Sequence, residues 1–176
     1  MASVDLHLAT APAREHALTR ALNHPVISSY DLVILDTSPY LGLLTINAIV
    51  ACSHIIVPVT CEFLPMLGLK LLRETLAFAK EQFHANAEIL GYILTMVDRR
   101  ERITDEVDAM LRETFGTKVF DGGIRVNTHH KASPSHHQTI YQYEPKGGKG
   151  RQDFDQLCDE VERRLSLREV RSKEKP

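Results

Sequence analysis

LVILDTSPYLGLLTINAIVACSHIIVPVT, residues 32–60, holds two short apolar runs on either side of a stretch with helical character. The first run, LVIL at 32–35, is too short for a helix and does not alternate with polar residues, which predicts a strand buried on both faces and ending at Asp36. The second run, HIIVPV at 54–59, has the same character. The small and apolar residues 43–51 between them predict a helix. This strand-helix-strand order points to an α/β fold.

The same alternation continues along the chain. ILGYILTM, residues 89–96, predicts a third buried strand. Residues 65–83 keep apolar side chains at helical spacing, and this length suits a crossover between parallel strands. A further helix is predicted at 104–115, with Thr104 as its cap and Gly116 just past its end. We therefore expect a three-layer α/β/α domain with a mainly parallel sheet.

The rest of the chain is less regular. Residues 11–22 predict a helix before the first strand, and the polar residues 121–151 predict a long functional loop. A last helix is predicted at 153–167. The basic residues 168–176 predict a frayed tail, so we expect one domain over residues 1–167.

Composition limits the classes of protein. The 176 residues are 43% hydrophobic and 25% charged, which is typical of a soluble globular domain. A net charge of −2 excludes a global attraction to nucleic acid or to an anionic membrane. Three cysteines without a CxxC pair predict reduced thiols. No run reaches the ~18 apolar residues of a membrane span, and no signal peptide is recognisable, so we expect a cytoplasmic protein.

Polar residues follow the predicted strands at the edge where ligands bind in open parallel sheets. Asp36 ends the first run, and Asp98 follows the third. Nucleotide hydrolases use an acid in this position to hold Mg²⁺, directly or through water. A cap on the next turn is the alternative interpretation of Asp36.

Residues 32–72 resemble the ParA/Soj/MinD family of deviant P-loop ATPases, which partition chromosomes and plasmids. The resemblance rests on LVILDTSPYLGLLTINAIVACSHIIVPVTCEFLPMLGLKLL. It continues through LGYILTMVDRR, FGTKVF, IRVNTHHKASPSHHQTI and YQYEPKGGKG to the final helix, and so covers almost the whole chain. Ser38 departs from the pattern, because a proline is usual there.

The resemblance implies an ATP- and Mg²⁺-dependent dimer that switches on and off nonspecific DNA, stimulated by a ParB-like centromere-binding protein. It implies that Asp36 is the catalytic Walker B-type acid, tied to Mg²⁺ through water. Six residues match positions on the base side of the nucleotide pocket, although ordinary strand-end and loop residues remain an alternative: Thr95, Met96, Asp98, Arg125, Val126 and Asn127. Such a protein would be cytoplasmic and associated with the nucleoid.

The phosphate-binding loop of that family, K-G-G-x-x-K-[ST], is missing from the sequence. Residues 1–31 contain no glycine. EPKGGKGRQ at 144–152 lacks a preceding apolar strand and the final Lys-Ser/Thr pair, so it predicts a flexible loop before the last helix. We expect the C-terminal part of an incomplete P-loop domain, with little or no ATPase activity and no tight binding of ATP alone. The sheet would then have unpaired edges, unless two strands close up or another chain fills the gap.

Three further interpretations stay open. A non-catalytic interaction protein could pair with a full-length ParA-like partner, and a metal-dependent hydrolase could use the loop histidines, His129, His130, His136 and His137. Solvated loop histidines are the alternative to that metal site. Basic residues near the C-terminus could contact DNA phosphates or form a solvated helix face: Arg163, Arg164, Arg168 and Arg171.

Overall fold

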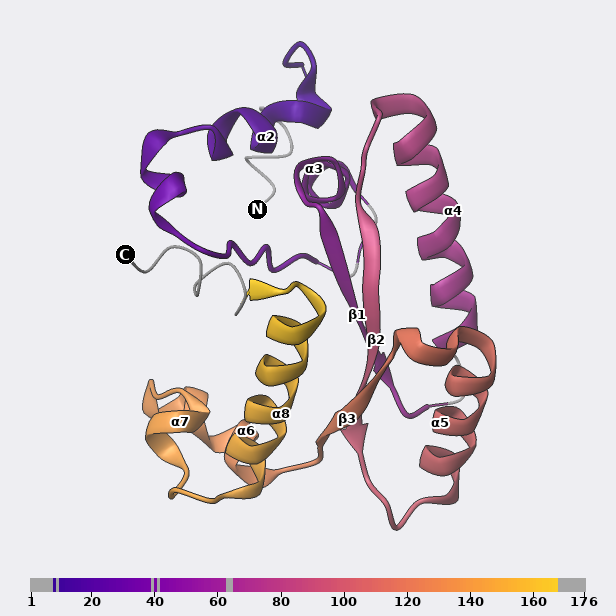
Figure 1. Ribbon diagram of the computed structural model, residues 1–176, viewed down its shortest axis with the longest axis vertical. Coiled ribbons are helices and arrows are strands. Elements are labelled where there is room, and N and C mark those ends of the chain that lie inside the picture. Colours follow the sequence, from indigo (N-terminus) through magenta and orange to yellow (C-terminus); the bar gives the residue numbers. More distant parts are fainter. Residues whose placement is uncertain (1–7, 9, 39, 41, 63–64, 168–176) are drawn as a thin grey trace. The chain divides into compact units, whose positions relative to one another are not determined.

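The computed structural model describes residues 8, 10–38, 40, 42–62 and 65–167 of the chain (Figure 1). The chain divides into two compact units. Unit 1 comprises Met1–Ile55 and Met66–Glu88, and unit 2 comprises Ile56–Pro65 and Ile89–Pro176. The single domain over residues 1–167 stays a prediction, and the predicted tail, 168–176, lies outside the described residues.

Three strands form a parallel sheet in the order β1-β2-β3: β1 His54–Thr60, β2 Glu88–Val97 and β3 Val119–Arg125. The strands predicted at 54–59 and 89–96 are confirmed. In β2 four consecutive residues, from Gly91 to Leu94, are buried, as expected of a central strand covered on both faces. Tyr92 lies opposite Val119 in the parallel pairing of β2 with β3.

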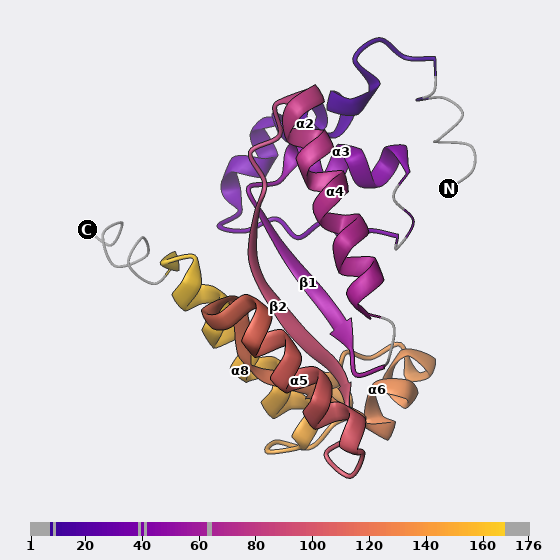
Figure 2. The ribbon, with the colours of Figure 1, turned by 90° about the vertical axis from the view of Figure 1, so that its right-hand side faces the viewer.

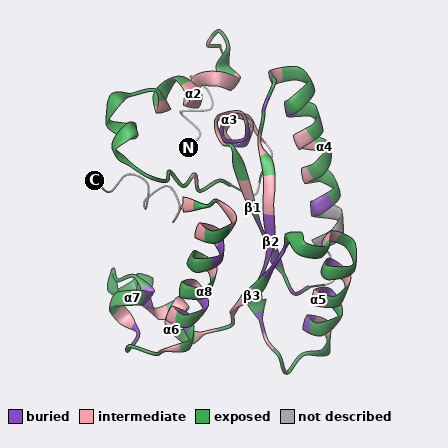
Figure 3. Cartoon of the chain, in the orientation of Figure 1, coloured by how far each residue is buried: buried purple, intermediate pink, exposed green. Residues whose placement is uncertain are grey.

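Helices cover both faces of the sheet in unit 2, so the predicted three-layer α/β/α architecture is confirmed. α5 (Arg102–Phe115) and α8 (Lys149–Arg164) lie on opposite sides of the strands (Figures 1 and 2). Buried residues follow the strands and the helix surfaces that point towards them (Figure 3). The largest fully buried apolar side chains are Phe120, Leu94, Leu111 and Val119.

The helices α2 (Ala17–Leu22), α3 (Leu43–Ala51) and α4 (Pro65–Phe83) belong to unit 1. α4 begins one residue before the second segment of that unit. The helices predicted at 43–51 and 65–83 are confirmed at both ends. Ile49, Ala79 and Ala85 form their shared apolar core. Asn47 ties α3 to the preceding segment, because its amide oxygen accepts from the Leu18 backbone N–H at 3.1 Å. Within the described part of the chain, no helix is long and apolar enough to cross a membrane.

The strand predicted at 32–35 is wrong. Residues 32–38 have no regular secondary structure, and Leu32, Val33 and Ile34 are 44%, 42% and 83% exposed. Residues 32–37 form no hydrogen bond with any part of the chain that the structure describes. The residue types of a segment indicate only that it suits a strand. The strand forms where a neighbouring strand pairs with its backbone N–H and C=O groups.

The long loop predicted at 121–151 is also wrong, because much of it is ordered into elements. β3 extends to Arg125, and α6 (Thr128–Ala132), a 3-10 turn (Ser133–His136) and α7 (Ile140–Tyr143) follow. The sequence Asp-Gly-Gly at 121–123 is typical of a turn. Here it forms a strand that pairs with β2, and Gly123 is needed because space is short: a Cβ at this position would lie 2.9 Å from Val97 Cγ2.

Two helix boundaries differ from prediction. α8 begins at Lys149 and ends at Arg164, although its start was predicted at residue 153 and its end at residue 167. α5 begins at Arg102 with Glu101 as its N-cap residue, so Thr104 is a fully buried residue of the first turn and not the cap. Helix ends depend on local capping contacts that apolar spacing does not report.

Ile34→Ala should change the free energy of unfolding by no more than about 0.5 kcal/mol, because the side chain is exposed. Ile49→Ala, the same substitution in the same unit at a residue that is 5% exposed, should cost about 2–5 kcal/mol. Urea denaturation of both variants measures the difference. Equal losses would show that Ile34 packs in a core, contrary to the structure.

Candidate functional site

A cavity of about 650 Å³ lies in unit 2, at the carboxyl ends of β2 and β3. Three segments line it: the end of β2 with the following turn, the end of β3 with the loop after it, and the residues that lead into α8. Open parallel sheets bind ligands at this edge. The lining residues are Val97, Asp98, Arg99, Arg100, Arg125, Val126, Asn127, Thr128, His129, Glu144, Pro145, Gly147, Gly148 and Lys149.

A β-bulge shapes the β2 side of the cavity. Thr95 lies opposite Ile124 and Val97 lies opposite Arg125, so Met96 is an extra residue, and it has a positive φ of 55°. The bulge turns the chain at the point where Val97 and Asp98 enter the cavity wall. The two residues before Val97 do not line the cavity, although the resemblance implied a role in nucleotide binding for both. The Thr95 hydroxyl donates to the Val59 carbonyl at 3.3 Å, and Met96 is half exposed.

Asp98 organises the turn that follows β2. Its carboxylate accepts from the backbone N–H of Arg100 at 3.0 Å and from the guanidinium of the same residue at 2.5 Å. The Arg100 side-chain hydrogen bond, helped by the backbone one, lowers the pKa of Asp98 to about 2. The cavity wall therefore carries a carboxylate that is ionised at neutral pH.

Arg125 joins the end of β3 to α8. Its backbone N–H donates to Asp153 Oδ2 at 3.0 Å, and its guanidinium lies 2.5 Å from Asp153 Oδ1. The Asp153 side chain is only 3% exposed, and its hydrogen bond raises the pKa of Arg125. Arg125 is thus held by a buried acid that sequence reasoning missed. An acid near the start of a helix is too common to signal such a role.

Asn127 and Glu144 form the floor of the loop after β3. The Asn127 Oδ1 accepts from the His129 backbone N–H at 2.8 Å, and its Nδ2 donates to Glu144 Oε1 at 3.0 Å. Both ends of the Asn127 amide are therefore used within the protein. Glu144, which sequence reasoning also missed, is buried and accepts from the Arg151 backbone N–H at 2.8 Å.

The stretch 144–152 resembles a phosphate loop only in composition. Residues 144–148 form a loop before the last helix, as predicted, but residues 149–152 already belong to α8. Its glycines make room for Glu144. A Cβ on Gly148 would collide with the Glu144 side chain, and one on Gly150 would lie 2.8 Å from Asn127 Nδ2. The glycines of this stretch therefore surround the Glu144 carboxylate, where a phosphate loop would surround a phosphate.

Cationic side chains outnumber carboxylates in the cavity wall. Arg99, Arg100, Arg125 and Lys149 line it together with two acids, Asp98 and Glu144. Several of these cations have acidic partners, such as Asp105 for Arg99 at 3.1 Å. The excess of cations over carboxylates in the wall still suits a ligand that carries negative charge.

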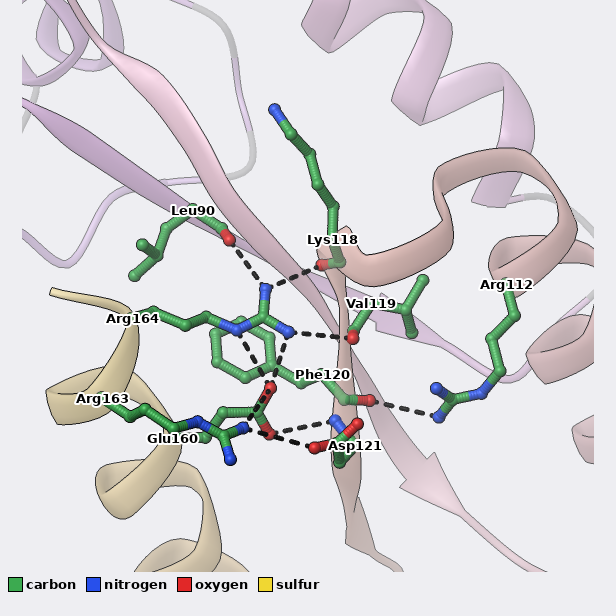
Figure 4. Close-up of polar contacts among 9 residues, drawn as sticks. All are labelled: Leu90, Arg112, Lys118, Val119, Phe120, Asp121, Glu160, Arg163 and Arg164. Carbon is green, nitrogen blue, oxygen red and sulfur yellow. Dashed lines mark hydrogen bonds and ion pairs between the residues drawn. The ribbon is translucent and has the colours of Figure 1, made fainter.

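Arg163 and Arg164 lie at the end of α8 in different surroundings (Figure 4). The Arg164 side chain is 17% exposed and points inward, where it donates to the Leu90 and Val119 carbonyls at 2.9 Å and pairs with Glu160 at 2.6 Å. The Arg163 side chain is 68% exposed. Of these two, Arg163 is the one open to a ligand outside the chain, and its guanidinium lies 3.3 Å from Asp121 Oδ2; Arg168 and Arg171 lie outside the described residues.

Asp36 and the loop histidines complete the predicted residues. Asp36 is exposed and lies in unit 1, outside any strand or helix, and its role with Mg²⁺ stays a prediction. The histidine pairs divide between α6, which holds His129 and His130, and the 3-10 turn that ends at His136. Among the described residues, no group of three or more His, Cys, Asp or Glu side chains is placed to hold a metal ion.

A family profile described as "AAA domain" matches residues 1–89, half of the chain. The chain belongs to this AAA domain family. Its curated relatives include Soj of Bacillus subtilis, the sporulation initiation inhibitor protein, which is 34% identical over 92% of this chain and 63% of the relative. They also include the chromosome-partitioning ATPase Soj of Thermus thermophilus, which is 36% identical over 91% of this chain and 61% of the relative.

The chromosome partitioning protein ParA of Caulobacter vibrioides is 32% identical to this chain, over 92% of this chain and 60% of the relative. The predicted membership of the ParA/Soj family is therefore confirmed. The chain spans about three fifths of the length of these relatives.

A solved structure supports the P-loop NTPase-like fold of this chain. Cobyrinic acid a,c-diamide synthase from Mycobacterium smegmatis, with bound ADP and magnesium, is similar with a TM-score of 0.64 and 28% sequence identity. The match covers 72% of this chain and 51% of that protein.

Proposed function

We propose that this chain is part of an ATP-dependent partitioning protein and that the cavity in unit 2 takes the base side of the nucleotide. The cavity carries the proposal, because four of the six residues that the resemblance implied lie together in its wall: Asp98, Arg125, Val126 and Asn127. Similarity to Soj and ParA proteins over nine tenths of the chain supports it. So does the likeness to a synthase with bound ADP and magnesium.

The residues of this chain would act mainly by shaping and orienting the pocket. Arg125 and Asn127 are held by Asp153 and Glu144, so the wall is set before a ligand arrives. A cavity of about 650 Å³ is large enough for a base and its ribose. Fixed polar groups in such a pocket orient a ligand without losing side-chain entropy on binding.

Asp36 would hold Mg²⁺ through a water molecule, and the ion would neutralise phosphate charge during ATP hydrolysis. Its carboxylate is a suitable oxygen ligand, and Mg²⁺ commonly binds one or two protein carboxylates together with water and phosphates. Asp36 is exposed, so its carboxylate is open to such an ion. The 176 residues contain no K-G-G-x-x-K-[ST] loop to surround the phosphates.

Assembly is the second part of the proposal. The chain would act as a dimer, or with a full-length ParA-like relative, together with a ParB-like centromere-binding protein and nonspecific DNA. The exposed apolar residues Leu32, Val33 and Ile34 favour the non-catalytic alternative, a protein that acts by pairing with such a relative. Stable heterodimers with a full-length relative in sedimentation would support that alternative, and monomers under all conditions would count against it.

The purified chain should show no ATP hydrolysis above background, and it should bind Mg²⁺-ATP only weakly. The reason is that the phosphate charge finds no glycine-rich cradle within these residues. Calorimetric titration and a phosphate-release assay measure both quantities, with Asp36→Asn as the matched variant. Tight binding, or turnover that Asp36→Asn abolishes, would contradict this expectation.

Arg163→Ala should weaken binding to nonspecific DNA and reduce the slope of log affinity against log salt by about 1, because one phosphate contact is lost. Arg73→Ala is the control, since it removes the same charge from an exposed position on α4. Fluorescence anisotropy at several salt concentrations measures both variants. Equal effects of the two substitutions would remove Arg163 from the proposed DNA contact.

A further inference from the structure

The most constrained polar group beside the cavity is the carboxylate of Glu144. Its side chain is 4% exposed and receives hydrogen bonds from three places. One oxygen accepts from the Arg151 backbone N–H at 2.8 Å. The other lies 3.0 Å from Asn127 Nδ2 and 2.8 Å from His129 Nδ1. Two of the three partners line the cavity.

Two backbone N–H groups fix the direction of the hydrogen bonds around Glu144. A backbone N–H can only donate, so the Arg151 contact makes Glu144 an acceptor, and the His129 N–H makes Asn127 Oδ1 an acceptor. The Asn127 amide is then oriented with Nδ2 towards Glu144. Burial alone would raise the pKa of Glu144, but the hydrogen bonds from Asn127, His129 and Arg151 lower it to about 2. Glu144 is therefore an ionised acceptor at neutral pH.

An ionised acceptor imposes a tautomer on the histidine. Because Glu144 cannot donate, His129 Nδ1 must carry the proton of their contact, so in the neutral ring Nε2 has a free lone pair. Tyr143 packs edge-on against the imidazole, with ring centroids 5.7 Å apart, and helps to hold its plane. Nε2 is the only polar atom that the ring has left for a ligand in the cavity.

We propose that His129 is a ligand-contacting residue of this cavity and that Glu144 is its positioning residue, which presents Nε2 as an acceptor for an N–H group of the ligand. This inference rests on the proposed function, in which the ligand is a nucleotide. An exocyclic amino group on the base is the matching donor. Specificity of this kind arises when a site is built to pair with a polar group that a competitor lacks.

The first experiment needs no ligand. In ¹⁵N NMR of the side chain at mildly alkaline pH, His129 should show the Nδ1–H tautomer in the wild-type chain. In the Glu144→Gln variant this preference should be lost, because a neutral amide no longer demands a donor at Nδ1. Glu160→Gln is the matched control, since Glu160 is also a buried glutamate of unit 2 but contacts Arg164 and Asp121. It should lower stability and leave the tautomer of His129 unchanged.

The second experiment titrates the wild-type chain and the Glu144→Gln variant with adenosine and with purine riboside, which lacks the amino group. Wild type should prefer adenosine by up to about tenfold, the scale of one hydrogen bond. The variant should lose most of this preference. Equal affinities in wild type would overturn the ligand contact.

The two experiments separate the inference from the function on which it rests. If neither nucleoside binds, the proposed nucleotide site and the ligand contact both fail, while the tautomer still decides the positioning role of Glu144. An Nε2–H tautomer in the wild-type chain, or one that Glu144→Gln and Glu160→Gln alter equally, would overturn that role.

Discussion

Buried carboxylates on α8 hold the outer edge of β3, and the candidate site depends on that attachment. Glu160 accepts from the backbone N–H of Asp121 at 3.0 Å, and Asp153 accepts from that of Arg125 at 3.0 Å. The acids are seven residues apart, about 10.5 Å along a helix, and the amides are four residues apart, about 13 Å along a strand. These lengths match well enough for one helix to serve both amides. Both hydrogen bonds are partly buried, and each acid accepts from a backbone N–H that a further strand would otherwise pair at this edge.

The consequence for the site is direct. With β3 held as far as Arg125, the next residue can donate its N–H to the Val97 carbonyl at 3.0 Å, and the loop after it begins at a fixed point. The bulge at Met96 and the cradle around Glu144 then complete the wall. Arg164 performs the corresponding task at the other end of the strands, where it satisfies carbonyls and pairs with Glu160. Side chains of α8 therefore make hydrogen bonds to the backbone of the sheet that a further strand would otherwise make.

Much of the fold could be predicted from sequence, because short-range patterns determine it. α3, α4, β1 and β2 follow apolar spacing and residue type, and these signals are complete within each segment. β3 was not predicted as a strand, since the Asp-Gly-Gly sequence within it is typical of turns. The strand predicted at 32–35 failed for the opposite reason. Its residue types suit a strand, but the described residues supply no hydrogen-bond partner for its backbone.

The site was predicted in part. Asp98, Arg125, Val126 and Asn127 share the cavity wall, as the resemblance to ParA/Soj proteins implied. The buried acids could not be predicted, because their partners are distant in sequence: 28 residues separate Arg125 from Asp153, and 39 separate Asp121 from Glu160. Glu144 was hidden by its neighbours, a run of glycines and lysines with the composition of a phosphate loop. Only the folded chain shows that the glycines surround a carboxylate.

Hydrogen exchange of two backbone amides tests the central role of α8 most directly. In the wild-type chain the amides of Asp121 and Arg125 should be protected like those of the central strand β2. Glu160→Ala should selectively release the Asp121 amide, and Asp153→Ala should selectively release that of Arg125. Free exchange of both amides in the wild-type chain, or an equal acceleration across β2 and β3 in each variant, would contradict the view that these carboxylates hold the edge of the sheet.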